Sequence, residues 1–212
     1  MCNLQRRNYV GKTHMAVGVA AGLLVLQPKN LQELILGTGV SAIGSVISDI
    51  DVGTSESHKD ADKIIGMTIA ALIFMVAVEC IWHVGIYKKL MRDSSVPREI
   101  IAAAIFLGIC AFGKEQSHRS FMHSILALVL LTGCVAIFLP LAAPYFEIGF
   151  LSHLSADLLN RRGERLLYPW KKGFCLRLCS SSGIVNKWMF QIGILVSAGM
   201  FLLLLVNICF QR

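Results

Sequence analysis

Charged residues are scarce in this sequence of 212 residues. Asp, Glu, Lys and Arg together make up 16% of the chain, whereas hydrophobic residues make up 55%. A soluble domain carries nearer to a quarter of charged residues. The composition therefore excludes an ordinary soluble protein and predicts an integral membrane protein whose partner is the lipid bilayer. The length suits a single unit, because one domain takes about 100–200 residues.

Several other features are missing. The seven cysteines form no C-x-x-C pair and lie mostly in apolar runs, so we expect buried, unreactive thiols. The basic pair Arg6 and Arg7 precedes an apolar run, as in an export signal, but no small-residue cleavage site follows that run. We therefore expect a cytoplasmic basic N-terminus at residues 1–12 and a first helix that is retained. The chain contains no internal repeat and no low-complexity tract.

Basic residues exceed acidic ones by 20 to 13. In a soluble protein this excess would raise nucleic acid as a partner. Here the basic residues lie in loops between apolar runs, where membrane orientation and anionic lipid headgroups account for them. We therefore expect no nucleic-acid partner.

Seven apolar segments predict an all-α fold, a polytopic membrane helical bundle that occupies residues 13–212 as one domain. The third and the last segments are the two with the roughly 20 residues needed to cross a bilayer. The others are short or interrupted, so several helices should be short or half-spanning. Such helices occur at membrane depth where they pack on protein or line a wet cavity, which is the setting of a buried site. The segments are Met15–Leu26, Leu31–Ser48, Ile64–Ile86, Ile100–Phe112, Ser124–Leu139, Tyr145–Leu158 and Trp188–Phe210.

Histidines and aspartates stand at the borders of these segments. If each segment reverses direction from a cytoplasmic N-terminus, they all fall at one face of the membrane. Fourteen of the twenty lysines and arginines fall on that side too, so the positive-inside rule makes it the cytoplasmic face. The border residues are His14, Asp49, Asp51, His118, His123, His153 and Asp157.

Each border position has alternative interpretations. His153 and Asp157 are four residues apart and share one face of a helix, where they bind one ion, orient one another or cap the helix end. Asp49 and Asp51 either bridge two cations or are solvated acids. Residues two apart diverge on a helix, so Asp51 is expected in the following loop. Thr13 is expected to be an N-cap that places His14 in the first turn of its helix.

His118 and His123 are five residues apart, about 140° around a regular helix, so they cannot both face one ion from it. An N-cap at Ser120 would remove this conflict by leaving His118 in the loop and His123 in the first turn. The alternative is a pair of interfacial histidines. The convergence of four His and three Asp favours a divalent metal, Zn²⁺, Mn²⁺ or Fe²⁺. Seven ligands exceed the need of one tetrahedral ion, which indicates either two ions or some outer residues.

Other polar residues receive no role in this site. His58 lies in a polar run typical of a solvated loop. Glu79 and His83 fall within the third apolar segment and read as an interfacial or ion-paired couple. The stretch Arg161–Arg165 is typical of a cationic loop that faces lipid headgroups.

The border residues carry a resemblance to the YdjM-like family of membrane-bound, metal-dependent hydrolases, some of them LexA-regulated. Four blocks in order resemble that family over residues 13–170, and the last continues through Leu166-Leu167-Tyr168-Pro169. Ser48, Ser120, Met122 and Asn160 depart from the family pattern, but no departure removes a ligand. The blocks are Thr13-His14 with Gly18, Ser48-Asp49-Ile50-Asp51 with Ser55, His118-Arg119 with His123-Ser124, and Ser152-His153 with Asp157-Leu158.

The resemblance implies a bacterial inner-membrane protein with a metal site, and the residues predict a reaction for it. We expect hydrolysis of an ester, foremost a phosphoester, of a lipid or other amphiphile by metal-activated water. Arg119 would clamp a phosphate or the developing negative charge, unless it is a headgroup anchor. A divalent metal-ion transporter or sensor is the alternative, although transport predicts ligands near mid-bilayer and often repeated halves. A structural membrane protein without a site is a third reading. The substrate, the metal and the oligomeric state stay open.

Overall fold

The computed structural model describes residues 2–51, 95–178 and 183–210, with side chains from residue 11 onward. These ranges are helical and contain no strand, which confirms the predicted all-α class. The predicted segment Ile64–Ile86, the pair Glu79 and His83, and His58 lie outside the described residues. The α-helices are α1 (Cys2–Leu26), α2 (Leu31–Val46), α5 (Ser95–Lys114), α6 (Ile125–Phe138), α7 (Ala143–Leu158) and α8 (Ile184–Phe210). Three short 3₁₀ helices are η1 (Ile47–Asp51), η2 (Phe121–His123) and η3 (Pro140–Ala142).

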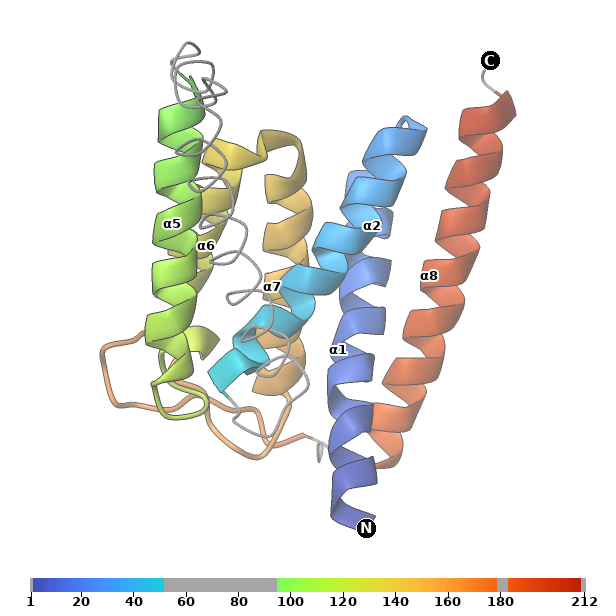
Figure 1. Ribbon diagram of the computed structural model, residues 1–212. Helices are drawn as coiled ribbons and strands as arrows, with labels where there is room; N and C mark the ends of the chain where they lie inside the picture. The colour runs from blue at the N-terminus through green and yellow to red at the C-terminus, as the bar shows by residue number, and fades with distance from the viewer. Residues whose placement is uncertain (1, 52–94, 179–182, 211–212) are drawn as a thin grey trace.

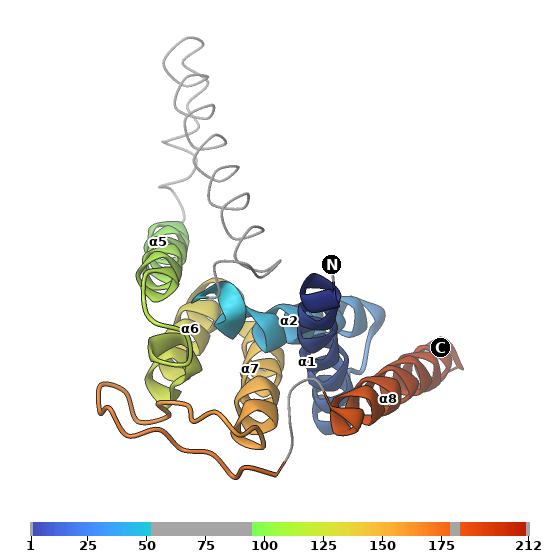
Figure 2. The ribbon, with the colours of Figure 1, turned by 90° about the horizontal axis from the view of Figure 1, so that it is seen from below.

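The helices pack in a bundle whose chain reversals gather several helix ends in one place. Helix α1 contacts α2, α7 and α8, α2 contacts α7, and α6 contacts both α5 and α7. The end of α2, the start of α6 and the end of α7 all lie at the lower end of the bundle in Figure 1. The loop that follows α7 runs beneath this end, as the view from below in Figure 2 shows.

Three stretches of the described chain are long and apolar enough to cross a membrane: Leu31–Asp51, Ser95–Lys114 and Ile184–Phe210. The expectation that the second and fourth apolar segments are too short was therefore wrong. Helix α5 begins five residues before its apolar run, because Pro97 is tolerated in a first helical turn, where its missing N–H has no partner to lose. Helix α2 continues directly into η1, so the helical stretch extends to Asp51, past Ser48, where the predicted segment ended.

Helix α1 also begins earlier than predicted, at Cys2. Thr13 therefore lies inside the helix, and its prediction as the N-cap was wrong. The upstream residues include leucine, glutamine and arginine, which are good helix formers, and the single Gly11 costs only about 1 kcal/mol. His14 consequently lies in the middle of α1, where Thr13 and His14 are both buried.

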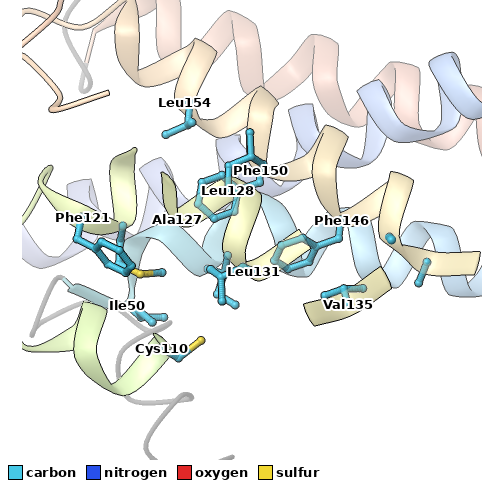
Figure 3. Close-up of a cluster of buried hydrophobic side chains, with 14 residues drawn as sticks. Ile50, Cys110, Phe121, Ala127, Leu128, Leu131, Val135, Phe146, Phe150 and Leu154 are labelled. Atoms are coloured by element: carbon cyan, nitrogen blue, oxygen red, sulfur yellow. The ribbon is translucent and has the colours of Figure 1, made fainter. Parts of the chain in front are cut away.

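An apolar core packs η1 and η2 against the bundle (Figure 3). Ile50 of η1 and Phe121 of η2 are buried in it, so the polar residues beside them in the chain are turned the other way. Neighbouring side chains of a 3₁₀ helix point in different directions, so each of these short helices has a packed apolar side and a polar side. The rest of the core comes from α5, α6 and α7 and includes Cys110, Leu128, Leu131, Val135, Phe146, Phe150 and Leu154.

Two glycines let α2 and α7 approach one another closely. A Cβ atom on Gly44 would collide with the carbonyl oxygen of Phe146, and one on Gly149 would collide with that of Ser41. Small residues at such crossings are common in membrane bundles, where backbone contact replaces side-chain packing. The contact fixes the second half of α2 against the first half of α7.

Gly44→Ala should therefore lower the stability of the bundle. The added methyl group meets backbone atoms that cannot move aside, and overpacking of this kind costs about 1–3 kcal/mol. Gly39→Ala on the same helix is the matched control, since nothing lies within 4 Å of a Cβ there. Thermal unfolding in detergent should show a lower midpoint for Gly44→Ala and an unchanged or higher one for Gly39→Ala. Equal midpoints would contradict the close approach.

Candidate metal centre

The seven predicted border residues lie together at the lower end of the bundle, supplied by α1, η1, the turn before η2, η2 itself and α7. Contacts between their side chains join all of them into one cluster. His123 and His153 are fully buried, and His14, Asp51 and Asp157 are nearly so. The distances between their donor atoms decide whether they can share an ion. The cluster consists of His14, Asp49, Asp51, His118, His123, His153 and Asp157.

Donor atoms of three residues surround Nε2 of His123 at the centre of the cluster. The Nε2 atom of His123 lies 3.3 Å from Nε2 of His153, 3.8 Å from Oδ1 of Asp49 and 3.7 Å from Oδ2 of Asp157. His153 Nε2 is also 3.8 Å from Oδ1 of Asp49. Bonds of about 2.0–2.2 Å to a tetrahedral Zn²⁺ give edges of about 3.3–3.6 Å between ligand atoms, because an edge is about 1.6 bond lengths. The 3.3 Å separation lies within this range, and the separations of 3.7 and 3.8 Å lie just above it.

His153 is held in the form that binds metal. Its Nδ1 atom lies 2.7 Å from the carbonyl oxygen of Ser45. A carbonyl only accepts hydrogen bonds, so Nδ1 carries the proton and donates it. In the neutral ring the lone pair is then on Nε2, the atom that faces His123 and Asp49. The backbone of α2 thus orients a ring carried by α7.

His14 closes the other side of the cluster. Its ring lies over that of His153 with centroids 4.1 Å apart, and its Nε2 is 3.4 Å from Oδ1 of Asp157. The Nδ1 atom of His14 is buried and has no hydrogen-bond partner within the described ranges. A buried nitrogen without a partner is costly in a folded protein unless it meets a ligand. Ligand atoms of His14, Asp49 and His153 lie within 4.8 Å of one another.

Asp51 holds the two remaining histidines. Its Oδ1 accepts a hydrogen bond of 2.9 Å from His118 Nδ1, and its Oδ2 lies 3.4 Å from His123 Nδ1. A carboxylate on one ring nitrogen leaves the other free for a metal. Asp51 lies in η1 and not in the loop that sequence reasoning assigned to it. Because 3₁₀ winding is tighter than α, Asp49 and Asp51 face different parts of the cluster from within one short helix.

The capping expected at Ser120 is made by Ser124 instead. Ser120 precedes η2 without a side-chain capping bond, whereas the Ser124 hydroxyl accepts from Ala127 N–H and caps α6. The sequence offers both serines before the apolar run, and the one that reaches a free helical N–H is the cap. His118 still lies outside the helical turn that contains His123, as the prediction required. The ring centroids of the two histidines are 5.1 Å apart.

Arg119 belongs to the cluster. Its Nη2 lies 2.7 Å from Oδ2 of Asp157, its Nη1 donates to the carbonyl oxygen of Arg162, and its backbone N–H donates to Asp51. The residue has a φ of 64°, in the left-handed region that costs a side chain about 1–3 kcal/mol. Contacts at both backbone and side chain hold it there. Its guanidinium is thus a positive charge held beside the carboxylate of Asp157.

Glu164 was missed in the sequence. The loop predicted to face lipid headgroups does expose Arg161 and Arg162, but Glu164 within it is fully buried. Neither carboxyl oxygen of Glu164 has a hydrogen-bond partner within the described residues. The one signal available was that Glu164 is the single acidic residue after Asp157 in a stretch rich in lysine and arginine.

Backbone hydrogen bonds hold the loop that carries Glu164 against the start of α6 and against Arg119. Glu164 and Phe174 exchange two of them, of 2.9 and 2.8 Å. Leu166 accepts from the N–H of Ile125 at the start of α6, and Arg165 donates to the carbonyl oxygen of Arg119. Residues on both sides of Glu164 are therefore tied to Arg119.

The cluster attracts positive charge. Burial by itself lowers the pKa of His123, but the hydrogen bond to Asp51 and the charges of Asp51, Asp49 and Asp157 raise the pKa above its ordinary value. The carboxylates around His123 thus stabilise a cation, which is either a proton on the ring or a metal ion at its nitrogen.

Solvent reaches the cluster at one side. The side chain of His118 is 38% exposed and that of Asp49 is 16% exposed, whereas His123 and His153 have no exposed surface. A solute therefore meets His118 and Asp49 first and the buried imidazoles last. Besides the group with His14, ligand atoms converge within 4.8 Å for Asp49 with His118 and His123, and for His123 with His153 and Asp157. These groups could hold a metal ion.

Comparison with known proteins agrees with the family resemblance of these blocks. The family model of the YdjM inner membrane protein matches residues 10–211, almost the whole chain. No curated protein and no solved structure matches this chain.

Glu164 should make the stability of the metal-free protein depend on pH. Burial and the negative charge of Asp157 raise its pKa to about 8, with Asp49 adding to this and His123 and Arg119 opposing it. In the unfolded chain it titrates near its ordinary value of 4.5. Below that pH the carboxyl is neutral in both states. As the pH rises to 8 the unfolded state ionises first, so folding stability is lost.

Glu164→Gln should remove this loss, because the amide stays neutral. With a chelator present, we expect the variant and the wild type to unfold at the same temperature at pH 4. At pH 8 the variant should unfold at a higher temperature, with a free energy of unfolding larger by on the order of 1–3 kcal/mol. Glu147→Gln, at an exposed position of α7, is the control and should match wild type at both pH values. A wild-type advantage at pH 8 would contradict the burial of an unpaired carboxyl.

Proposed function

The chain belongs to the family of the YdjM inner membrane protein, and we propose that it is a membrane-embedded, metal-dependent hydrolase. The proposed substrate is an ester, foremost a phosphoester, carried by a lipid or another amphiphile. The proposed cofactor is one or two divalent ions, with Zn²⁺ and Mn²⁺ or Fe²⁺ as the candidates that suit imidazole and carboxylate ligands.

One observation carries the proposal: the buried Nε2 atom of His123 lies 3.3–3.8 Å from donor atoms of His153, Asp49 and Asp157. Buried imidazoles and carboxylates this close are costly without a cation among them. A purely structural role would be served as well by apolar side chains in a chain this hydrophobic. The donor set is instead kept in a membrane bundle, where polar groups mark functional sites.

A divalent ion in such a centre supplies Lewis acidity and brings the pKa of water down to about 7. The protein residues have separate tasks. Asp49 would hold the ion from the side of the cluster that solvent reaches. Asp51 keeps the rings of His118 and His123 in place. Arg119 contributes positive charge beside the centre, where negative charge develops on the substrate.

The place of the cluster favours hydrolysis over transport. Its residues come from the middle of α1, the end of α7, η1, η2 and the turn before η2, and its exposed side is at His118. The ends of α2 and α7 and the start of α6 lie at one end of the bundle (Figure 1). A transport site needs access from two sides and lies near mid-membrane. A site at a helix border is reached by a headgroup while the acyl chains stay in the bilayer. We assign this end to the cytoplasmic face of a multi-pass protein, because basic residues are concentrated there.

His153→Ala should abolish bound metal. Purified wild-type protein should retain Zn²⁺ or Mn²⁺ on elemental analysis after dialysis, and the variant should lose affinity at least tenfold. Tyr145→Phe removes a hydrogen bond to Glu33, away from the cluster, and is the matched control for a change in a buried polar contact on α7. Its metal content should equal that of wild type. Unchanged metal in His153→Ala would remove the metal centre.

Asp49→Asn should impair metal-dependent hydrolysis. Suitable probes are p-nitrophenyl phosphate, its diester and a short-chain phosphatidic acid in mixed micelles. We expect release of product that requires Zn²⁺ or Mn²⁺ and falls at least tenfold in the variant, since Asn is the weaker ligand. Wild-type protein that binds metal but cleaves none of these esters would exclude the phosphoesterase. Zinc uptake into vesicles that depends on His153 would assign transport instead.

A further inference from the structure

One carboxylate oxygen of Asp157 faces both the centre of the cluster and the Arg119 guanidinium. Its Oδ2 atom is the oxygen that faces His123 across the centre, at 3.7 Å, and it is also the oxygen that Arg119 holds at 2.7 Å. Its other oxygen accepts a 2.9 Å hydrogen bond from Asn160 and lies 3.4 Å from His14. A cation at the centre would therefore share its carboxylate oxygen with a guanidinium.

Two positive charges on one buried oxygen repel each other, and the repulsion is strong where water is excluded. Arg119 is held at its two ends, by the backbone bond to Asp51 and by the Arg162 carbonyl. Its Nε atom is buried without a hydrogen-bond partner in the described part of the chain. The guanidinium thus has a free donor in addition to the two that it uses.

A buried carboxyl group without a hydrogen-bond partner in the described residues lies in the adjoining loop. Arg119 bonds to Arg162 through its side chain and to Arg165 through its carbonyl oxygen, and Glu164 lies between these two residues. The carboxyl group of Glu164 is fully buried and makes no hydrogen bond within the described ranges. Its electrostatic coupling to Arg119 and to Asp157 agrees with this placement.

We propose that Glu164 is the alternative partner of the Arg119 guanidinium and receives it when a divalent cation binds at Asp157. The exchange leaves each positive charge with its own carboxylate: the cation with Asp157, and the guanidinium with Glu164, which releases its proton to solvent as it ionises. Glu164 is then a positioning residue, which strengthens cation binding through Arg119 and touches no substrate. The inference rests on the proposed metal centre and adds to it a residue that lies outside the predicted set.

The test is a double-mutant cycle on metal affinity. The apparent Kd for Zn²⁺ is measured by competition with a chromophoric chelator for full-length protein in detergent, with wild type, Glu164→Gln, Arg119→Ala and the double variant. Glu164→Gln should weaken binding about tenfold, the lower limit for loss of an outer partner of a metal ligand. In the Arg119→Ala background, where no guanidinium competes for Asp157, the same change should alter Kd less than twofold.

Equal losses in the two backgrounds would overturn the proposal, because a general effect on folding or charge does not depend on Arg119. An unchanged Kd in Glu164→Gln would overturn it as well. Glu164→Asp retains the charge and should restore most of the affinity, and failure to do so would assign a merely structural role. Glu147→Gln is the control for removal of an acidic charge from an exposed site.

The same measurements separate this proposal from the proposed function. If the wild-type protein binds neither Zn²⁺ nor Mn²⁺, the metal centre itself fails. If the wild type and Arg119→Ala bind Zn²⁺ and Glu164→Gln binds it equally well, the centre stands and only the role of Glu164 fails.

Discussion

Mutual repulsion among buried carboxylates is the constraint on which the rest of this structure depends. Asp49, Asp51 and Asp157 all approach His123 within 3.8 Å. Taking such charges out of water costs several kcal/mol each unless positive charge is brought with them. The chain supplies some of it through Arg119 and through the raised pKa of His123. The negative charge that remains is what would favour a bound cation in the cluster.

The bundle meets this constraint with backbone contacts more than with side-chain packing. Gly44 and Gly149 bring α2 and α7 together so that the carbonyl of Ser45 can orient His153. Apolar residues of η1 and η2 anchor the same short helices whose polar residues enter the cluster. Rigid support of this kind holds charged groups in place against their repulsion, which flexible loops could not do.

The sequence predicted much of the fold because apolar runs and their interruptions mark helices directly. The gathering of seven border residues followed from alternate reversal of those helices, and the structure brings the same seven side chains together; their role as ligands stays a prediction. Local geometry was less accessible. Ser120 and Ser124 both look like caps, and only the position of Ala127 N–H decides between them. Asp51 was placed in a loop because α-helical spacing was assumed where the chain is 3₁₀.

Glu164 shows why the remaining part of the site could not be read from the sequence. No periodic pattern governs residues 159–178, so the direction of each side chain depends on tertiary hydrogen bonds, such as those from Ile125 to Leu166 and between Glu164 and Phe174. A lone acid among basic residues is normally expected at the surface, paired with its neighbours. Here its backbone is fixed and its neighbours Arg161 and Arg162 point outward, so the carboxyl is buried without either of them. A group buried at such cost persists where another state of the protein uses it, and a charge exchange around Asp157 is a state of that kind.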